Sequence, residues 1–175
     1  GRNGYDILAA IRQEDREQPV IMLTAKSSDD DIVHGLALGA DDYVAKPFSI
    51  AQLVLRVQAV LRRAHVGLDD VLTIRLRPGF DIDVRSLSAR TPEGDVGFTR
   101  REMEVLNYLA AHAERPVPRE ELLHKVWGYA RHLEIETRTV DIHIAKLRRK
   151  IEPDPRQPRH LLTVRSGGYR LLLEP

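Results

Sequence analysis

The sequence predicts two successive units, an incomplete α/β unit over residues 1–64 and an α+β unit over residues 71–175. In the first unit, helical periodicity alternates with short continuous apolar runs such as PVIMLT at residues 19–24, a pattern typical of strands covered on both faces. In the second unit, short strand-like segments separated by turns are followed by three helices and a hairpin. A short link over residues 65–70 separates the two patterns.

The first unit contains three helices and two strands in alternation. We expect a helix ending near Arg12, a strand over 19–24, a helix from the acidic run 28–31 to Gly39, a strand over 42–45, and a helix capped by Ser49. The inward side chains predicted for this last helix are Leu53, Val57, Val60 and Leu61. Two strands are too few for a sheet that three helices could cover, so this unit is expected to be the second half of a doubly wound domain. Residues 1–6 resemble neither a signal peptide nor a natural start, and we expect the sequence to begin inside that domain.

The second unit begins with a predicted antiparallel meander over residues 72–76, 80–84, 87–91 and 96–98. Residues 99–102 (TRRE) form a capping box that opens a helix, and Pro118 is expected to start a second helix. A third helix is expected to start near Thr137, and the chain then forms a hairpin around residues 165–168. Three helices followed by a hairpin are the parts of a winged helix-turn-helix.

The third helix has one apolar face and one basic face. Val140, Ile144, Leu147 and Ile151 recur at steps of four, three and four, which predicts a buried stripe. The opposite face carries Arg138, Ile142, Ala145, Lys146 and Arg149, and it is flanked on one side by Thr139, His143 and Lys150. A basic face with a small residue at its centre suits the DNA major groove, although a solvated helix with incidental charges is the alternative interpretation.

Positive charge is concentrated around this helix and the hairpin. Residues 137–173 carry nine Lys or Arg against three Asp or Glu, whereas the whole chain has a net charge of +1. This asymmetry indicates an anionic partner for one end of the molecule. Arg165, at the hairpin tip, could enter a minor groove. The predicted DNA-binding residues are Arg138, Thr139, Ile142, His143, Lys146, Arg149, Lys150 and Arg165.

Composition argues against several other classes of function. The chain has no cysteine, which excludes disulfides, thiolate metal sites and a cysteine nucleophile within it and fits a reducing, cytoplasmic setting. No apolar run approaches the roughly 18 residues of a membrane span. His124, His132 and His143 lack metal-ligand spacing, and no nucleophile–base constellation is present. We therefore predict no metal site and no enzymatic activity.

Four motifs in the second unit carry a resemblance to a known family. They are FTRRE at 98–102, VWG at 126–128, RTVDIHI at 138–144 and TVRSGGYR at 163–170. With them the sequence resembles the OmpR/PhoB-type response regulators, and the resemblance covers nearly the whole chain. It implies that the third helix reads the major groove, that the hairpin arginine reaches the minor groove, and that the loop 128–136 contacts RNA polymerase or positions the helix. Residues 166–168 read Ser-Gly-Gly where relatives usually have Gly-x-Gly.

The first unit resembles the receiver domain of the same family through LTA at 23–25, GADDY at 39–43 and KPF at 46–48. The resemblance implies that Thr24 and Lys46 contact a phosphorylated aspartate, that Tyr43 follows Thr24 as a switching aromatic, and that the Lys46–Pro47 peptide bond is cis. The family's phosphoacceptor and the acidic pair that holds Mg²⁺ would lie before Gly1. We therefore expect no cofactor in this chain and Mg²⁺ only in the intact receiver.

The resemblance also implies that the intact, phosphorylated protein forms a symmetric dimer. The expected interface combines an apolar patch of Val33, Leu36 and Leu55 with the ion pairs Asp42–Arg56 and Asp41–Arg63. A third pair of the family is missing, because Ile32 and Gln52 occupy its positions.

Together these observations predict a sequence-specific, DNA-binding transcription regulator that a sensor histidine kinase controls in its intact form. The alternative is a winged-helix adaptor that binds another protein and does not bind DNA.

Overall fold

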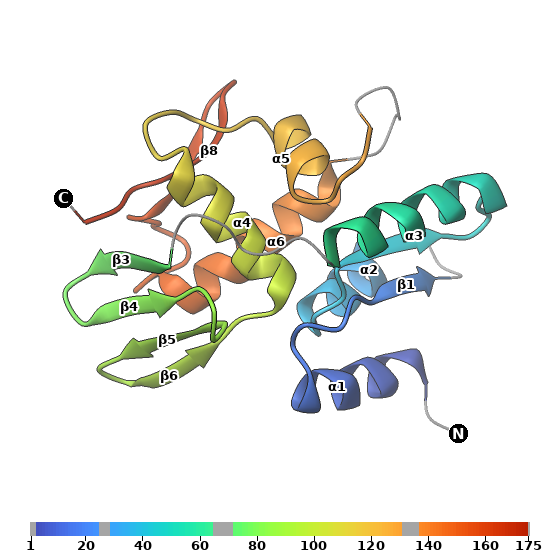
Figure 1. Ribbon diagram of the computed structural model, residues 1–175, viewed down its shortest axis with the longest axis horizontal. Coiled ribbons are helices and arrows are strands. Elements are labelled where there is room, and N and C mark those ends of the chain that lie inside the picture. The colour runs from blue at the N-terminus through green and yellow to red at the C-terminus, as the bar shows by residue number, and fades with distance from the viewer. Residues whose placement is uncertain (1–2, 25–28, 65–71, 131–136, 175) are drawn as a thin grey trace.

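The computed structural model describes residues 3–24, 29–64, 72–130 and 137–174, and the predicted link 65–70 lies outside them. The elements follow the predicted order (Figure 1). They are α1 (Gly4–Glu14), β1 (Ile21–Thr24), α2 (Asp29–Ala37), β2 (Asp42–Ala45), α3 (Ile50–Ala64), β3 (Thr73–Arg77), β4 (Phe80–Asp83), β5 (Ser88–Thr91), β6 (Gly94–Gly97), α4 (Arg100–Ala111), α5 (Arg119–Lys125), α6 (Arg138–Ile151), β7 (Leu161–Val164) and β8 (Gly168–Leu171).

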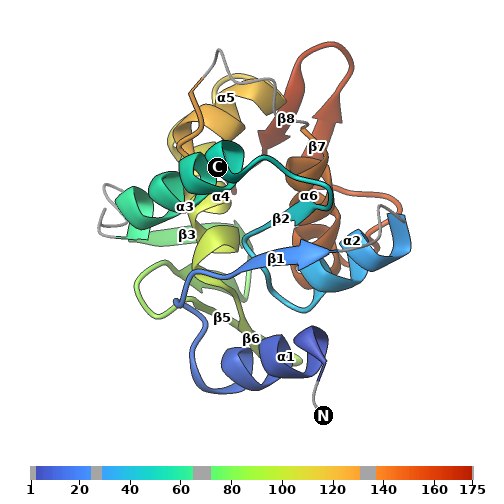
Figure 2. The same ribbon diagram turned by 90° about the vertical axis from the view of Figure 1, so that its right-hand side faces the viewer.

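The N-terminal part, residues 3–64, is a parallel pair of strands between helices. β1 pairs with β2 from Ile21↔Asp42 to Thr24↔Ala45, and α1 and α3 lie on opposite sides of the pair (Figures 1 and 2). Its core is small and consists of Leu8, Ile32, Leu36 and Ala40. The fold class predicted for this part, a partial doubly wound unit, is confirmed.

The prediction for the inward face of α3 was partly wrong. Val60 is buried, but Val57 and Leu61 are 39% and 53% exposed. Two described strands offer too little surface to cover the apolar face of a helix of this length. The neighbouring Ala59 is buried instead, and it joins the core of the C-terminal part.

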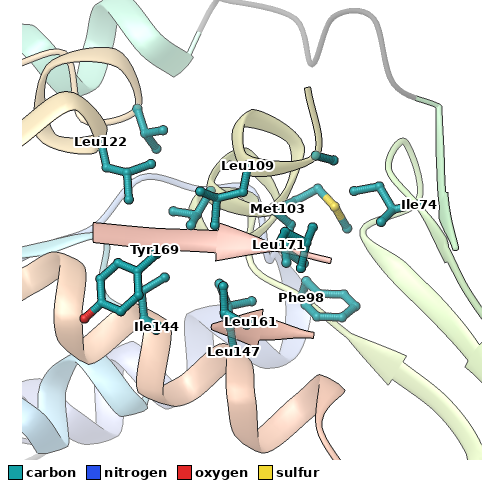
Figure 3. Close-up of a cluster of buried hydrophobic side chains, with 14 of the residues drawn as sticks. Ile74, Phe98, Met103, Leu109, Leu122, Ile144, Leu147, Leu161, Tyr169 and Leu171 are labelled. Carbon is teal, nitrogen blue, oxygen red and sulfur yellow. The ribbon is translucent and has the colours of Figure 1, made fainter. Parts of the chain in front are cut away.

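The C-terminal part, residues 72–174, combines an antiparallel sheet, three helices and a hairpin. The sheet has the order β3–β4–β5–β6, and β7 pairs with β8. Side chains from the sheet, from α4, α5 and α6 and from both hairpin strands meet in one continuous core (Figure 3). The predicted meander, helices and hairpin are therefore confirmed.

Local signals account for the positions of α4, α5 and α6. The capping box is present, since Thr99 accepts from the Glu102 backbone and Glu102 accepts from the Thr99 backbone. Thr137 is the N-cap of α6, as predicted. Pro118 is the N-cap of α5 and not its first helical residue, so that helix begins one position later than expected. No helix in the described ranges is long and apolar enough to cross a membrane.

Candidate nucleic-acid interface

Helix α6 is held in place by its buried stripe and by bonds to the hairpin. Val140, Ile144, Leu147 and Ile151 are each at most 1% exposed, which confirms the predicted stripe. Arg148 donates from Nε to the Leu161 carbonyl at 2.9 Å and from Nη2 to the Thr163 hydroxyl at 2.8 Å. On the outer side, Ala145 and Arg149 are exposed and Arg138 is half-buried.

The hairpin presents Arg165 to solvent at its tip. Ser166 and Gly168 both adopt positive φ, 62° and 106°, so the Ser-Gly-Gly sequence closes the turn with a serine in the left-handed region. A Cβ on Gly168 would collide with the Val117 carbonyl, and the Val117–Tyr169 bridge fixes the base of the hairpin at this point. Glycine is therefore required at position 168 by close backbone approach.

One carboxylate, Asp141, connects α5, α6 and the hairpin. It accepts from Arg119 Nε at 2.5 Å and from the Tyr169 hydroxyl at 2.6 Å. Burial and the bond to Asp141 raise the pKa of Tyr169, so its hydroxyl keeps its proton at neutral pH. This network sets the position of the hairpin relative to α6. Sequence reasoning missed it because its members lie far apart along the chain.

Three predicted DNA contacts are turned inward, and this part of the prediction needs correction. Thr139 and His143 are 2% and 3% exposed. His143 Nδ1 lies 2.7 Å from the Thr139 carbonyl, and its ring meets that of Trp127 edge-on at a centroid distance of 5.0 Å. Burial lowers the pKa of His143 to about 4, so the imidazole is neutral at physiological pH.

Lys150, the third inward residue, neutralises a buried acid. Its Nζ lies 2.7 Å from Glu102 Oε1 and 2.8 Å from the Gly97 carbonyl. Lys146 lies one helical turn earlier, 4.0 Å from Glu102 Oε2. Burial alone would raise the pKa of Glu102, but the two lysines outweigh it and the pKa lies below its ordinary value. No local sequence signal indicates this pairing, because Glu102 lies 48 residues before Lys150.

Helix α2 packs against α6 (Figures 1 and 2). Ile142 contacts the N-terminal core that contains Leu36, and Lys146 Nζ lies 3.5 Å from the Leu36 carbonyl oxygen. Burial lowers the pKa of Lys146. In this conformation α2 therefore covers part of the predicted DNA-binding face.

The C-terminal part also binds Asp41 and Asp42 at the start of β2, called the Asp41–Asp42 turn below. Trp127 Nε1 donates to the Asp41 carbonyl at 2.8 Å, and the Tyr129 hydroxyl donates to the Asp42 carboxylate. Arg101 Nε lies 3.8 Å from the Asp41 carboxylate. All five residues are at most 5% exposed.

The two carboxylates of this turn have further partners. Arg12 lies 3.4 Å from Asp41, and Arg56 lies 3.1 Å from Asp42. Burial raises the pKa of Asp41, although Arg101, the Val20 N–H and Arg12 each lower it. Burial likewise raises the pKa of Tyr129. The packing of α2 on α6 and the binding of this turn are together called the interdomain contact below; its residues are Leu36, Asp41, Asp42, Arg101, Trp127, Tyr129, Ile142 and Lys146.

The residues expected to sense phosphorylation lie at one edge of the parallel strand pair. The Lys46 N–H donates to the Thr24 carbonyl at 2.7 Å. Thr24 and Lys46 therefore lie side by side at the ends of the two neighbouring strands. The Lys46 side chain is exposed, Tyr43 is half-buried on β2, and the Lys46–Pro47 bond is cis as expected. A cavity of 310 Å³ beside Thr24 is also lined by Tyr5 and Asp31.

The residues expected at a dimer interface do not form one surface here. Leu36 is buried in the N-terminal core while Val33 and Leu55 are exposed, so the predicted three-residue patch is interrupted. Asp42 and Arg56 are paired within the chain. Asp41 pairs with Arg12 and Arg101, and the side chain of Arg63 lies outside the described part of the structure.

Two family models match the chain. Residues 1–58 match the response regulator receiver domain, and residues 93–171 match the C-terminal region of transcriptional regulatory proteins. A mutant of RitR is 26% identical over 97% of this chain and 73% of its own, with a TM-score of 0.69. DrrB of Thermotoga maritima, described as an OmpR/PhoB homologue, is 34% identical over 97% of this chain and 74% of its own, with a TM-score of 0.46. The DNA-binding domain of Klebsiella pneumoniae RstA, solved with the RstA box, is 27% identical over 57% of this chain and 95% of its own, with a TM-score of 0.48.

The two family matches occur in the order of the two structural parts and together cover most of the chain. This family consists of transcription factors and not of enzymes. The chain thus belongs to the OmpR/PhoB-type response regulators and carries their DNA-binding transcription-regulator domain behind part of a receiver domain.

Proposed function

We propose that this chain binds DNA sequence-specifically, with the outer face of α6 in a major groove and Arg165 in the adjacent minor groove. The Asp141 network supports this proposal most directly, because it holds α6 and the hairpin in one fixed arrangement. A rigid frame places Arg149 and Arg165 at a constant separation, which simultaneous recognition of two grooves requires. Both side chains are exposed.

The proposal is tested by the salt dependence of binding to genomic DNA fragments. Each phosphate contact contributes about 0.9 to the slope of log affinity against log salt. Arg149→Ala or Arg165→Ala should weaken binding without unfolding the protein. Arg90→Ala is the matched control, because Arg90 is exposed on β5. This strand belongs to the sheet at the end of the C-terminal part that lies opposite to the tip of the β7–β8 hairpin (Figure 2). Affinity that stays constant from low to moderate salt would favour the adaptor alternative.

We also propose that phosphorylation by a sensor histidine kinase controls the intact protein. A hydroxyl and an ammonium at one sheet edge, Thr24 and Lys46, can both donate hydrogen bonds to a phosphoryl dianion. Asp31 is the sole carboxylate that lines the neighbouring cavity among the described residues, so this chain does not fit Mg²⁺ by itself. In a protein extended upstream to a complete receiver, Lys46→Ala should abolish the effect of acetyl phosphate on DNA affinity. An unaltered response in that variant would refute the role of Lys46.

The intact, phosphorylated protein is proposed to form a homodimer. Val33 and Leu55 are exposed, and opening of the interdomain contact would release the Asp42 carboxylate, which pairs with Arg56, from the Tyr129 hydroxyl. Sedimentation of the intact protein with a phosphoryl mimic should show a dimer that Arg56→Glu weakens. A monomer–dimer balance that is the same in wild type and variant would argue against this surface. A contact of the loop 128–136 with RNA polymerase stays a prediction, since residues 131–136 lie outside the described ranges.

A further inference from the structure

The β7–β8 hairpin rests on residues 113–117 of the loop that joins α4 to α5, called the hairpin platform below (Figure 1). Val117 exchanges two backbone hydrogen bonds with Tyr169, at 2.7 and 2.9 Å, and so pairs with β8 on the side away from β7. Arg170 Nε donates to the Ala113 carbonyl at 2.9 Å. The platform is therefore bound to β8 at both of its ends.

The turn that carries Arg165 also packs on the platform. A Cβ built on Gly167 would lie 3.2 Å from the Pro116 Cβ, so the proline ring lies directly against the backbone of the turn. Such close packing transmits displacements, because neighbouring groups have no free space into which they could relax. A shift of the platform therefore displaces the turn, and the exposed Arg165 side chain moves with it.

The platform is fixed in turn by an ion pair between Arg115 and Glu121. The two terminal nitrogens of Arg115 donate to the two carboxylate oxygens of Glu121 at 3.0 and 2.7 Å, a bidentate geometry that fixes the orientation of both groups. Tyr108 of α4 donates its hydroxyl to the same carboxylate at 2.5 Å. The bond to Arg115 lowers the pKa of Glu121, and burial raises the pKa of Tyr108 to about 12, so the carboxylate is charged and the hydroxyl protonated at neutral pH. This cluster ties the platform to both α4 and α5.

We propose that Tyr108, Arg115 and Glu121 are positioning residues that aim Arg165, and that the hairpin platform thereby sets how strongly the chain prefers a narrow, A·T-rich minor groove. This inference rests on the proposed function, in which Arg165 lies in a minor groove. A narrow minor groove has an enhanced negative potential that favours an inserted arginine. This gain depends on the depth at which the guanidinium lies. A hairpin without a fixed platform therefore loses the preference, while the contacts of α6 with DNA are kept.

The test is Glu121→Gln in the 175-residue chain, which keeps the size of the side chain and removes the charge that Arg115 binds. The probes are two duplexes made from the tightest-bound genomic fragment, with either an A·T run or a G·C run where the footprints of wild type and Arg165→Ala differ. Wild type should bind the A·T duplex about fivefold more tightly or better. Glu121→Gln should bring this ratio toward one, while its Kd for the G·C duplex stays within about twofold of wild type.

Two further measurements separate the aim of Arg165 from other effects of the substitution. In an Arg165→Ala background, Glu121→Gln should have no further effect on either Kd, because the platform acts through Arg165. Hydrogen exchange at the Val117 and Tyr169 amides, which bond across the platform, reports on the hairpin without DNA. Exchange at both amides should be faster in Glu121→Gln than in wild type.

Glu120→Gln is the matched control, because Glu120 is the exposed neighbour of Glu121 on α5 and the variant makes the same change of charge. Arg115→Lys is a second variant, which keeps the positive charge but not the bidentate geometry, and it should act in the same direction as Glu121→Gln. An A·T preference that is absent in wild type, unchanged in Glu121→Gln or lowered equally by Glu120→Gln would overturn the proposal. Faster exchange at both amides with no DNA binding by any form of the chain would support the positioning of the hairpin by the platform and refute the proposed function.

Discussion

His143 makes the stability of this protein depend on pH in a defined window. Its imidazole is buried in α6 against Trp127, and burial lowers its pKa from 6.5 to about 4. Between these values the unfolded chain binds a proton that the folded chain does not bind. The contribution to stability is therefore complete above pH 6.5, decreases as the pH falls, and is lost by about pH 4.

The magnitude follows from the size of the shift. Each pKa unit corresponds to about 1.4 kcal/mol, so His143 contributes about 3 kcal/mol to the free energy of unfolding above pH 6.5. The charges that act on the ring are Glu102, which favours the protonated form, and Arg101 and Lys146, which disfavour it. Burial is the largest cause, and the neighbouring charges partly cancel.

The assay is urea denaturation at a series of pH values between 7 and 4.5 for wild type and His143→Gln, followed by circular dichroism. Other acids titrate in both proteins, so the difference between the two curves isolates His143. That difference should decrease by about 1.4 kcal/mol per pH unit once the pH is well below 6.5. His34→Gln, at an exposed position on α2, is the control for the substitution itself. Parallel curves for wild type and His143→Gln would show that His143 is not buried in a neutral state.

Three further variants test the frame around α6, each by urea denaturation. Thr99→Ala removes the capping oxygen that accepts from the Glu102 N–H at 3.2 Å and should cost about 1 kcal/mol; no loss would mean that the capping box is not formed in solution. Leu147→Ala opens a cavity at a fully buried position and should lower the free energy of unfolding by about 2–5 kcal/mol. Arg149→Ala should leave the free energy of unfolding unchanged. Equal losses in the two variants would show that the faces of α6 are assigned wrongly. Tyr169→Phe removes the hydroxyl that donates to Asp141 and should lower the free energy of unfolding by about 1 kcal/mol. It should also weaken DNA binding, because the hairpin that carries Arg165 loses this bond. Unaltered DNA affinity would refute the role of the Asp141 network in placing Arg165.

The elements of the fold were predictable because their causes are local. The buried stripe of α6 and the capping box of α4 each depend on residues within a few turns of one helix, and both are present. The hairpin around Arg165 was likewise set by a short glycine-containing turn. Periodicity failed where the partner surface was absent, as for Val57 and Leu61 on α3.

The candidate site was less predictable because its partners are distant in sequence. Trp127 and Asp41 are separated by 86 residues, and Lys150 and Glu102 by 48. Helical periodicity places a side chain on a face, but it does not reveal which element covers that face. For this reason Thr139 and His143 were expected at the surface and are buried.

The interdomain contact combines favourable and unfavourable polar interactions. Three buried polar atoms in or beside it, Arg101 Nε, Glu102 Oε2 and Thr139 Oγ1, have no hydrogen-bond partner among the described residues. Each such atom costs about 1–3 kcal/mol relative to its hydrated state. Against this cost stand the bonds of Trp127 and Tyr129 to the Asp41–Asp42 turn and a modest apolar contact at Ile142. Two of the three atoms also belong to charged groups with a partner of opposite charge, since Arg101 Nε lies 3.8 Å from Asp41 and Glu102 Oε2 lies 4.0 Å from Lys146, and these ion pairs offset part of the cost.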